Sequence, residues 1–292
     1  MPRHQIEFTD MPKRRPMQGA LIALIAVAVV AIGLLVALFI LPRLRGEQPE
    51  QAAEPAASTV PAVEDTPAPE QSGPDLSTFA GQLQTGQVES IRVIGDSITA
   101  GYLIDGFDDP SDTGVLVYSG NEGEYYETPT YVNCWTNAFR AYASQQGVTN
   151  FVNAGISGFR MQYLAEEPDA WLGDGADVIV VMLGANDAAK ESIEDFRAFA
   201  EQALTEADAR SKHLVVVSPP NNERTDAVNL YGLDQIDQVL GELSAAHGWE
   251  HISMYDVLEV GTDDFFPDQC HPTEQGSAKL WEAFRSQLEL PN

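Results

Sequence analysis

Four short polar sequences contain the residue types that acyl transfer requires: GDS (95–97), NAGISG (153–158), GAND (184–187) and DQCH (268–271). A serine hydroxyl is a weak nucleophile until a neighbouring base takes its proton. Ser97 is the candidate nucleophile and His271 the candidate base. Asp268, three residues before the histidine, is the candidate carboxylate that would hold the imidazole in the correct tautomer. These residues predict a Ser-His-Asp triad.

A tetrahedral intermediate also needs hydrogen-bond donors for its oxyanion. The backbone N–H groups of Ser97 and Gly158 and the side-chain amide of Asn186 are the candidates. A glycine at position 158 lets the backbone approach a substrate closely. We assign Asp96 and Asp187, which adjoin these residues, to helix capping and turn bonding.

The elements that must position these residues alternate between strands and helices. Apolar runs at residues 90–94, 151–153, 178–183, 213–218 and 251–255 predict strands, and amphipathic stretches at 131–146, 191–210, 226–247 and 273–288 predict helices. This alternation indicates a parallel sheet with helices on both faces. In such sheets ligands bind beyond the carboxyl ends of the strands, which is where the polar sequences fall. Asp187 is a candidate cap for the helix predicted at 191–210.

With these blocks in order, the chain resembles the SGNH (GDSL-type) hydrolase family over residues 90–288. The resemblance implies a three-layer α/β/α, flavodoxin-like fold with a central parallel sheet of about five strands. It also implies ester hydrolysis or acyl transfer without a metal or cofactor. The chain departs from the family pattern in a long insertion at 103–130 and in a cysteine within the DQCH block.

The sequence before this domain divides into three parts: a tail (1–19), an apolar helix (20–41) and a linker (42–75). The 22 residues of the apolar run contain no charge and no proline. A helix of that length spans about 33 Å, close to the hydrocarbon thickness of a bilayer. A buried core helix and a cleaved signal peptide are the alternatives, but the run is long and ends in a poor cleavage site. We therefore expect an uncleaved transmembrane signal anchor.

The charges around this helix predict its orientation. Four basic residues precede it and two follow it closely, which places the N-terminus in the cytoplasm and residues 76–292 outside. The part after Arg45 carries 10 basic and 42 acidic residues, a net charge of −32. This charge argues against nucleic-acid partners and against contact of the domain with anionic lipid, so the helix alone should hold the protein at the membrane.

The linker is rich in proline, alanine and acidic residues and has no hydrophobic periodicity, which predicts a disordered segment. Such a segment is either a spacer between membrane and domain or a linker of no particular length.

The insertion at 103–130 is the other long irregular stretch of the sequence, and a loop of that length usually has a function. The tyrosines in and next to this insertion have three alternative roles: they stack on a sugar, line an acyl site or simply pack in the fold. They are Tyr118, Tyr125, Tyr126 and Tyr131.

Three functions use or explain the same residues. The first is a membrane-anchored, extracytoplasmic serine esterase acting on small-molecule, lipid or glycan esters. The second is an acyltransferase acting on cell-surface glycans, and the third is a catalytically silent glycan-binding module.

The only cysteines, Cys134 and Cys270, are both expected outside the cytoplasm, near one edge of the sheet. We expect them to form a disulfide that steadies the turn before His271, the alternative being two buried thiols.

Overall fold

The computed structural model describes residues 74–291. The predicted tail, the predicted transmembrane helix and all but two residues of the predicted linker lie outside this range. Among the described residues, no helix combines the length and the apolar character that crossing a membrane requires. The domain begins at Asp75, whose carboxylate accepts hydrogen bonds from the backbone N–H and the hydroxyl of Ser77.

Five parallel strands form the central sheet, in the order β4-β1-β5-β6-β7. Their bounds are β1 (Ser90–Gly95), β4 (Asn150–Gly155), β5 (Ala176–Met182), β6 (Ser211–Ser218) and β7 (Glu250–Ser253). Counted along the chain within this sheet, the order is 2-1-3-4-5, that of flavodoxin-like doubly wound folds. The prediction of a central parallel sheet is confirmed, and the strand order reverses between β1 and β5, which is where ligands bind in such folds.

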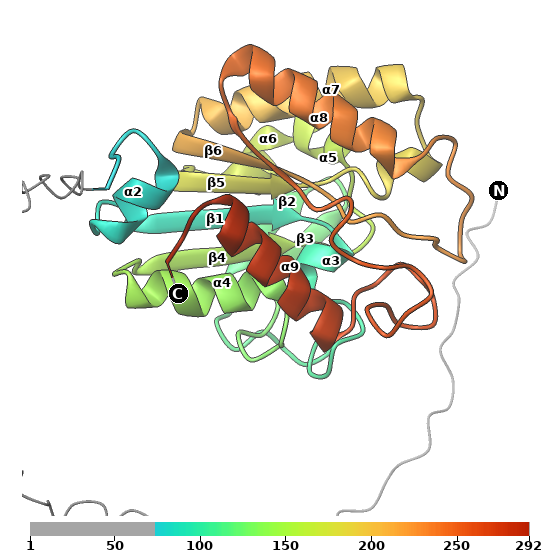
Figure 1. Ribbon diagram of the computed structural model, residues 1–292, viewed down its shortest axis with the longest axis horizontal. Coiled ribbons are helices and arrows are strands. Elements are labelled where there is room, and N and C mark those ends of the chain that lie inside the picture. Colours follow the sequence, from blue (N-terminus) through green and yellow to red (C-terminus); the bar gives the residue numbers. More distant parts are fainter. Residues whose placement is uncertain (1–73, 292) are drawn as a thin grey trace, which may run out of the picture. The chain divides into compact units, whose positions relative to one another are not determined.

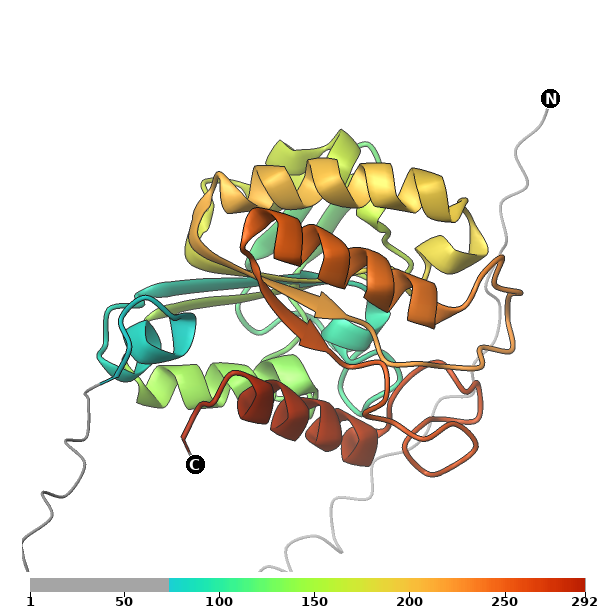
Figure 2. The same cartoon turned by 45° about the horizontal axis from the view of Figure 1, so that its top comes forward.

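Helices cover both faces of the sheet (Figures 1 and 2). One face carries α2 (Phe79–Gln84), α4 (Trp135–Gln145) and α9 (Glu274–Gln287); the other carries α5 (Met161–Glu166), α6 (Pro168–Leu172), α7 (Ile193–Asp208) and α8 (Leu233–His247). All four predicted long helices are present, but α4 and α8 begin later than predicted. The chain before α8 is irregular from residue 219 and enters the helix through the extended Gly232.

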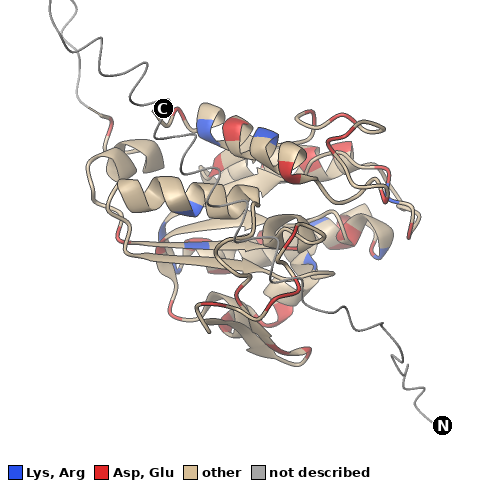
Figure 3. Cartoon of the chain, turned by 90° about the horizontal axis from the view of Figure 1, so that it is seen from below, with Lys and Arg blue, Asp and Glu red and all other residues tan. Residues whose placement is uncertain are grey.

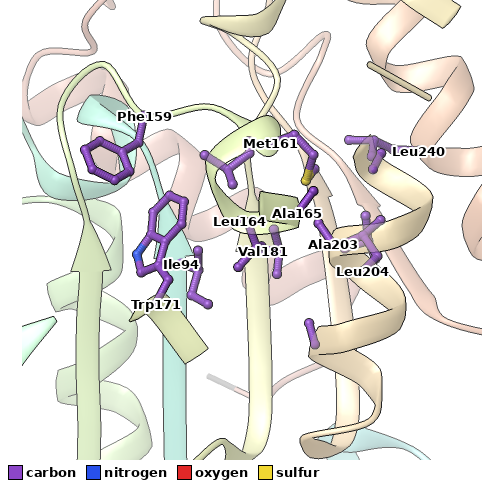
Figure 4. Packing of buried hydrophobic residues seen from close by; sticks show 14 of the residues in the cluster. Ile94, Phe159, Met161, Leu164, Ala165, Trp171, Val181, Ala203, Leu204 and Leu240 are labelled. Carbon is purple, nitrogen blue, oxygen red and sulfur yellow. The ribbon is translucent and has the colours of Figure 1, made fainter. Parts of the chain in front are cut away.

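The strands are buried on both faces, which explains why their sequences are almost continuously apolar. Along β5, Ile179 and Val181 pack toward α5–α8, while Val178 and Val180 pack toward α2, α4 and α9. Figure 4 shows Val181 with side chains of α5 and α7 in the first of these two layers. Period-two alternation along a buried strand thus supplies both halves of the core.

The predicted cap of α7 is wrong. Ser192 caps this helix and accepts a hydrogen bond from the Asp195 N–H at 3.1 Å. Asp187 instead lies in the short 3₁₀ helix η2 (Asp187–Ala189), fully buried, and accepts from the Met161 N–H at 2.9 Å. Its carboxylate therefore fixes the start of α5. Burial, reinforced by the Glu191 carboxylate, raises the pKa of Asp187 well above its ordinary value.

The 103–130 insertion contains an antiparallel hairpin, β2 (Leu116–Gly120) and β3 (Gly123–Tyr126), separate from the main sheet. The guanidinium of Arg92, on β1, donates to the Val117 carbonyl at 2.7 Å. At the end of the insertion, the buried Glu127 pairs with Arg140 of α4. These contacts fix the insertion to the domain.

Candidate active site

A tight turn at the carboxyl end of β1 places Ser97 at the edge of the sheet. The short helix α3 (Ser97–Ala100) starts directly after the strand, and Asp96 caps it by accepting from the Ile98 N–H at 2.9 Å. The end of β4 packs closely beneath α3, because a Cβ on Gly155 would lie 2.4 Å from the Ala100 nitrogen. A side chain at position 155 would therefore displace the helix that carries Ser97.

His271 lies between Ser97 and Asp268. Its Nε2 is 2.9 Å from the Ser97 Oγ, and its Nδ1 is 2.6 Å from the Asp268 Oδ2. Although burial acts to raise it, the pKa of Asp268 is lowered, since the carboxylate accepts from the His271 side chain and from the backbone N–H groups of Cys270 and His271. The three predicted triad residues, from opposite ends of the domain sequence, form one continuous hydrogen-bonded chain.

The turn that presents His271 is held by its own hydrogen bonds. Asp268 Oδ1 accepts from the N–H groups of Cys270 at 3.0 Å and His271 at 3.1 Å. The Phe266 N–H donates to the His271 carbonyl at 2.9 Å, and the Gln269 N–H donates to the Phe266 carbonyl at 2.9 Å. These bonds supply the rigidity that we expected from a disulfide.

The predicted disulfide is absent, because Cys134 and Cys270 are both free thiols. Cys134 is the N-cap residue of α4, and its Sγ lies 3.8 Å from the Asn153 side-chain amide. The charged neighbours of Cys270 are instead Arg224 and acidic groups that include Asp96. Burial raises the pKa of Cys134 to about 11 and that of Cys270 to about 12, so both thiols stay protonated and inert near neutral pH.

The three predicted oxyanion donors lie around the same edge. Asn186 follows β5 and directs its Nδ2 toward the Phe159 carbonyl, at 3.1 Å, and the Asp96 Oδ2, at 3.4 Å. Gly158 is exposed and has a φ of 79°, a left-handed conformation that favours glycine. Among the hydrogen bonds of residues 74–291, the backbone N–H groups of Ser97 and Gly158 have no protein acceptor. Both are therefore available to an incoming oxygen.

Two residues that the sequence analysis missed complete the surroundings. Arg224, in the loop between β6 and α8, donates from Nη1 to the Asn186 Oδ1 at 3.2 Å, and its guanidinium binds Asp226 through two bonds of 2.8 Å. The Tyr102 ring packs edge-on against the His271 imidazole, with centroids 4.7 Å apart. A lone arginine in a loop and a tyrosine after a short helix carry no pattern that sequence reading could detect.

Arg224 also determines how the Asn186 amide is oriented. Because the guanidinium can only donate, it fixes the Oδ1 of Asn186 toward itself and leaves the Nδ2 on the other side.

Burial raises the pKa of Asp96 to about 6, against the opposing effects of the Ile98 N–H and the charges of His271 and Arg224. The site thus contains one carboxyl group that titrates in the weakly acidic range.

Comparison with known proteins identifies the class. The family model of the GDSL-like lipase/acylhydrolase family matches residues 93–279, and the chain belongs to this family. It is accordingly a hydrolase of ester bonds. No curated protein matches the chain in sequence.

Solved structures share the fold. An α/β hydrolase from the metagenome of Lake Arreo is 18% identical, with a TM-score of 0.55 over 70% of this chain and 96% of that one. An acetylxylan esterase from Geobacillus stearothermophilus is 18% identical, with a TM-score of 0.53 over 71% and 97% of the two chains. A lipase/acylhydrolase from Enterococcus faecalis is 21% identical, with a TM-score of 0.51 over 70% and 97%.

Proposed function

We propose that the protein is a serine esterase, anchored in the membrane by residues 20–41, with its catalytic domain outside the cytoplasm. Ser97 attacks the ester carbonyl while His271 Nε2 takes the hydroxyl proton. The imidazolium then returns this proton to the departing alcohol. Water, activated in the same way, releases the acid and restores Ser97. Asp268 keeps the imidazole oriented and stabilises its charged form.

The observation that carries this proposal is the hydrogen-bonded chain from the Ser97 Oγ through the His271 ring to the Asp268 carboxylate, with its two contacts at 2.9 and 2.6 Å. Both distances lie within the hydrogen-bond range that proton transfer requires. The two ring nitrogens of His271 define the roles of its neighbours. Nε2 faces the Ser97 hydroxyl and can accept its proton, and Nδ1 faces the Asp268 carboxylate, which orients the ring.

The oxyanion would be bound by the free N–H groups of Ser97 and Gly158 and by the Asn186 amide. Both hydrogens of that amide have acceptors, but the contact with Asp96 is 3.4 Å, longer than a normal N–H···O bond. This hydrogen is the one that can turn to a developing negative charge, where it would form a stronger, charge-assisted bond.

The location outside the cytoplasm rests on the sequence alone. It is supported by the length of the apolar run at 20–41 and by the basic residues before it. The substrate is an ester of a small molecule, a lipid or a glycan. The fold shared with an acetylxylan esterase supports a glycan ester among these.

Labelling with a fluorophosphonate tests the nucleophile. We expect intact-mass analysis of the full-length protein in detergent to show one added phosphonyl group in the wild type and none in Ser97→Ala. Ser119→Ala, a matched change of an exposed serine on the hairpin, should be labelled like the wild type. Phosphonylation of the Ser97→Ala variant at the wild-type rate would overturn the proposal.

A further inference from the structure

The insertion forms a rigid platform rather than a loose loop. Its Tyr118 is buried, packs edge-on against Phe159 and Trp171, and donates its hydroxyl to Glu167. Burial, with the Glu167 hydrogen bond, raises the pKa of Tyr118 to about 12, so this hydroxyl keeps its proton. The hairpin is therefore fixed in place.

The outer strand of this platform exposes two aromatic rings. Tyr125 and Tyr126 on β3 are 37% and 56% exposed. Exposed aromatic rings that gather on one fixed strand are a candidate binding surface. Of the four tyrosines singled out in the sequence, Tyr118 packs in the core and Tyr131 donates its hydroxyl to Asp109. Tyr125 packs one edge against Tyr118 and Phe159 and exposes the rest of its ring, and Tyr126 is the more exposed of the pair on β3.

A cavity of about 620 Å³ lies between this strand and the edge of the main sheet. It is lined by Tyr125, Tyr126, Tyr102 and Phe107 together with Ile156 and Ser157. Tyr102 is the residue whose ring contacts His271, and Ser157 adjoins Gly158. The cavity therefore lies next to the triad, although neither Ser97 nor His271 is among its lining residues.

The lining distinguishes between possible ligands. Its apolar residues are four aromatic side chains and two prolines, with Ile156 as the one branched aliphatic residue among the described residues that line it. A long acyl chain is best enclosed by flexible aliphatic side chains, whereas flat rings beside hydroxyl and carboxylate oxygens match the C–H face and the hydroxyl groups of a sugar. The polar lining includes Asp109, Ser111 and Thr128, which can accept hydrogen bonds from sugar hydroxyls.

The charges of the lining residues narrow the class of sugar that this cavity could bind. Asp109 is an exposed carboxylate at this cavity, and Figure 3 shows acidic positions spread along the domain with fewer basic ones among them. Within residues 74–291, no lysine or arginine lines the cavity. An acidic sugar would be repelled there, because no basic side chain of the lining offsets its charge.

We propose that this cavity binds the sugar ring that carries the ester, so that the substrate is an O-acylated, uncharged oligosaccharide. This inference rests on the proposed function, because it places the ligand beside the Ser97 nucleophile. The insertion thus supplies the specificity for the alcohol part of the substrate, while the motif residues supply the chemistry.

The test compares three kinds of substrate in the full-length protein purified in detergent. They are p-nitrophenyl acetate, which has no sugar; a panel of acetylated xylo-, manno- and cello-oligosaccharides; and p-nitrophenyl decanoate, which has a long acyl chain and no sugar. Tyr126→Ala should lower the ratio of kcat/KM for the best sugar ester to that for p-nitrophenyl acetate about three- to tenfold, as expected for one lost aromatic contact. Val228→Ala, which removes an exposed apolar side chain outside the cavity, should leave the ratio unchanged.

The outcomes separate the two proposals. Turnover of p-nitrophenyl acetate that survives Ser97→Ala would contradict the proposed function. If Ser97→Ala abolishes turnover but Tyr126→Ala leaves the ratio unaltered, the sugar site is wrong. It is also wrong if the wild type cleaves p-nitrophenyl acetate but none of the sugar esters, or if Tyr126→Ala impairs p-nitrophenyl decanoate more than the sugar ester, which would indicate an acyl-chain site.

Discussion

At the scale of single residues, Asn186 tests the oxyanion site. Asn186→Ala should lower kcat about 10²–10³-fold, because the amide would stabilise the transition state more than the bound substrate. Steady-state kinetics on p-nitrophenyl acetate measure this effect, with Asn133→Ala, an exposed asparagine that donates to Glu274, as the control. A change confined to KM would instead assign Asn186 to substrate binding.

Asp96 makes stability depend on pH in a defined direction. Its pKa is about 6 in the folded protein against an ordinary value of 3.8, so between these values the folded state holds a proton that the unfolded state has lost. The stabilising contribution is therefore complete below pH 3.8 and is lost as the pH rises through 6. It amounts to about 3 kcal/mol.

Denaturant unfolding of the wild type and Asp96→Asn measures this contribution. The free energy of unfolding of the wild type, relative to the variant, should fall between about pH 4 and pH 7, because the amide that replaces the carboxyl group does not titrate. The comparison cancels the effects of Asp187 and other buried groups to first order. A difference between the two proteins that is constant over this range, or that grows with pH, would show that Asp96 is not held in its protonated form.

At the scale of elements, the hydrogen bonds of short turns decide where helices begin. Ser192→Ala removes the side-chain cap of α7 and should lower the free energy of unfolding by about 1 kcal/mol. Ser119→Ala, in the exposed hairpin, serves as the control and should have a much smaller effect. Equal loss in the two variants would mean that the cap contributes no stability of its own.

At the scale of the whole molecule, the sequence predicts a cytoplasmic N-terminus and an external domain. Protease added to intact cells should release the domain by cutting within the proline-rich residues 42–75, because their composition predicts a disordered segment and such segments are cleaved first. Immunoblotting of the medium detects the released fragment. A domain that is protected until the cells are lysed would reverse the predicted orientation.

Much of the site could be read from the sequence because the fold repeats one local rule. Each motif follows a strand, and the carboxyl ends of parallel strands meet at one edge, so Ser97, Gly158 and Asn186 had to converge once the strands were recognised. The apolar runs identified the strands because burial on both faces leaves little room for polar residues. The parallel α/β class and the approximate element positions therefore followed from the sequence pattern, and the candidate site residues were chosen by their place after the strands.

Only the tertiary structure decided the features that depend on contacts between distant segments. The Arg224 bond to Asn186, the Tyr102 contact with His271 and the cavity beneath β3 have no periodic or local signal. The state of the two cysteines also depends on the tertiary structure. The sequence predicted a disulfide between them, whereas in the structure both are buried free thiols. Local patterns specify which elements form, whereas the packing of loops on those elements specifies what the site can bind.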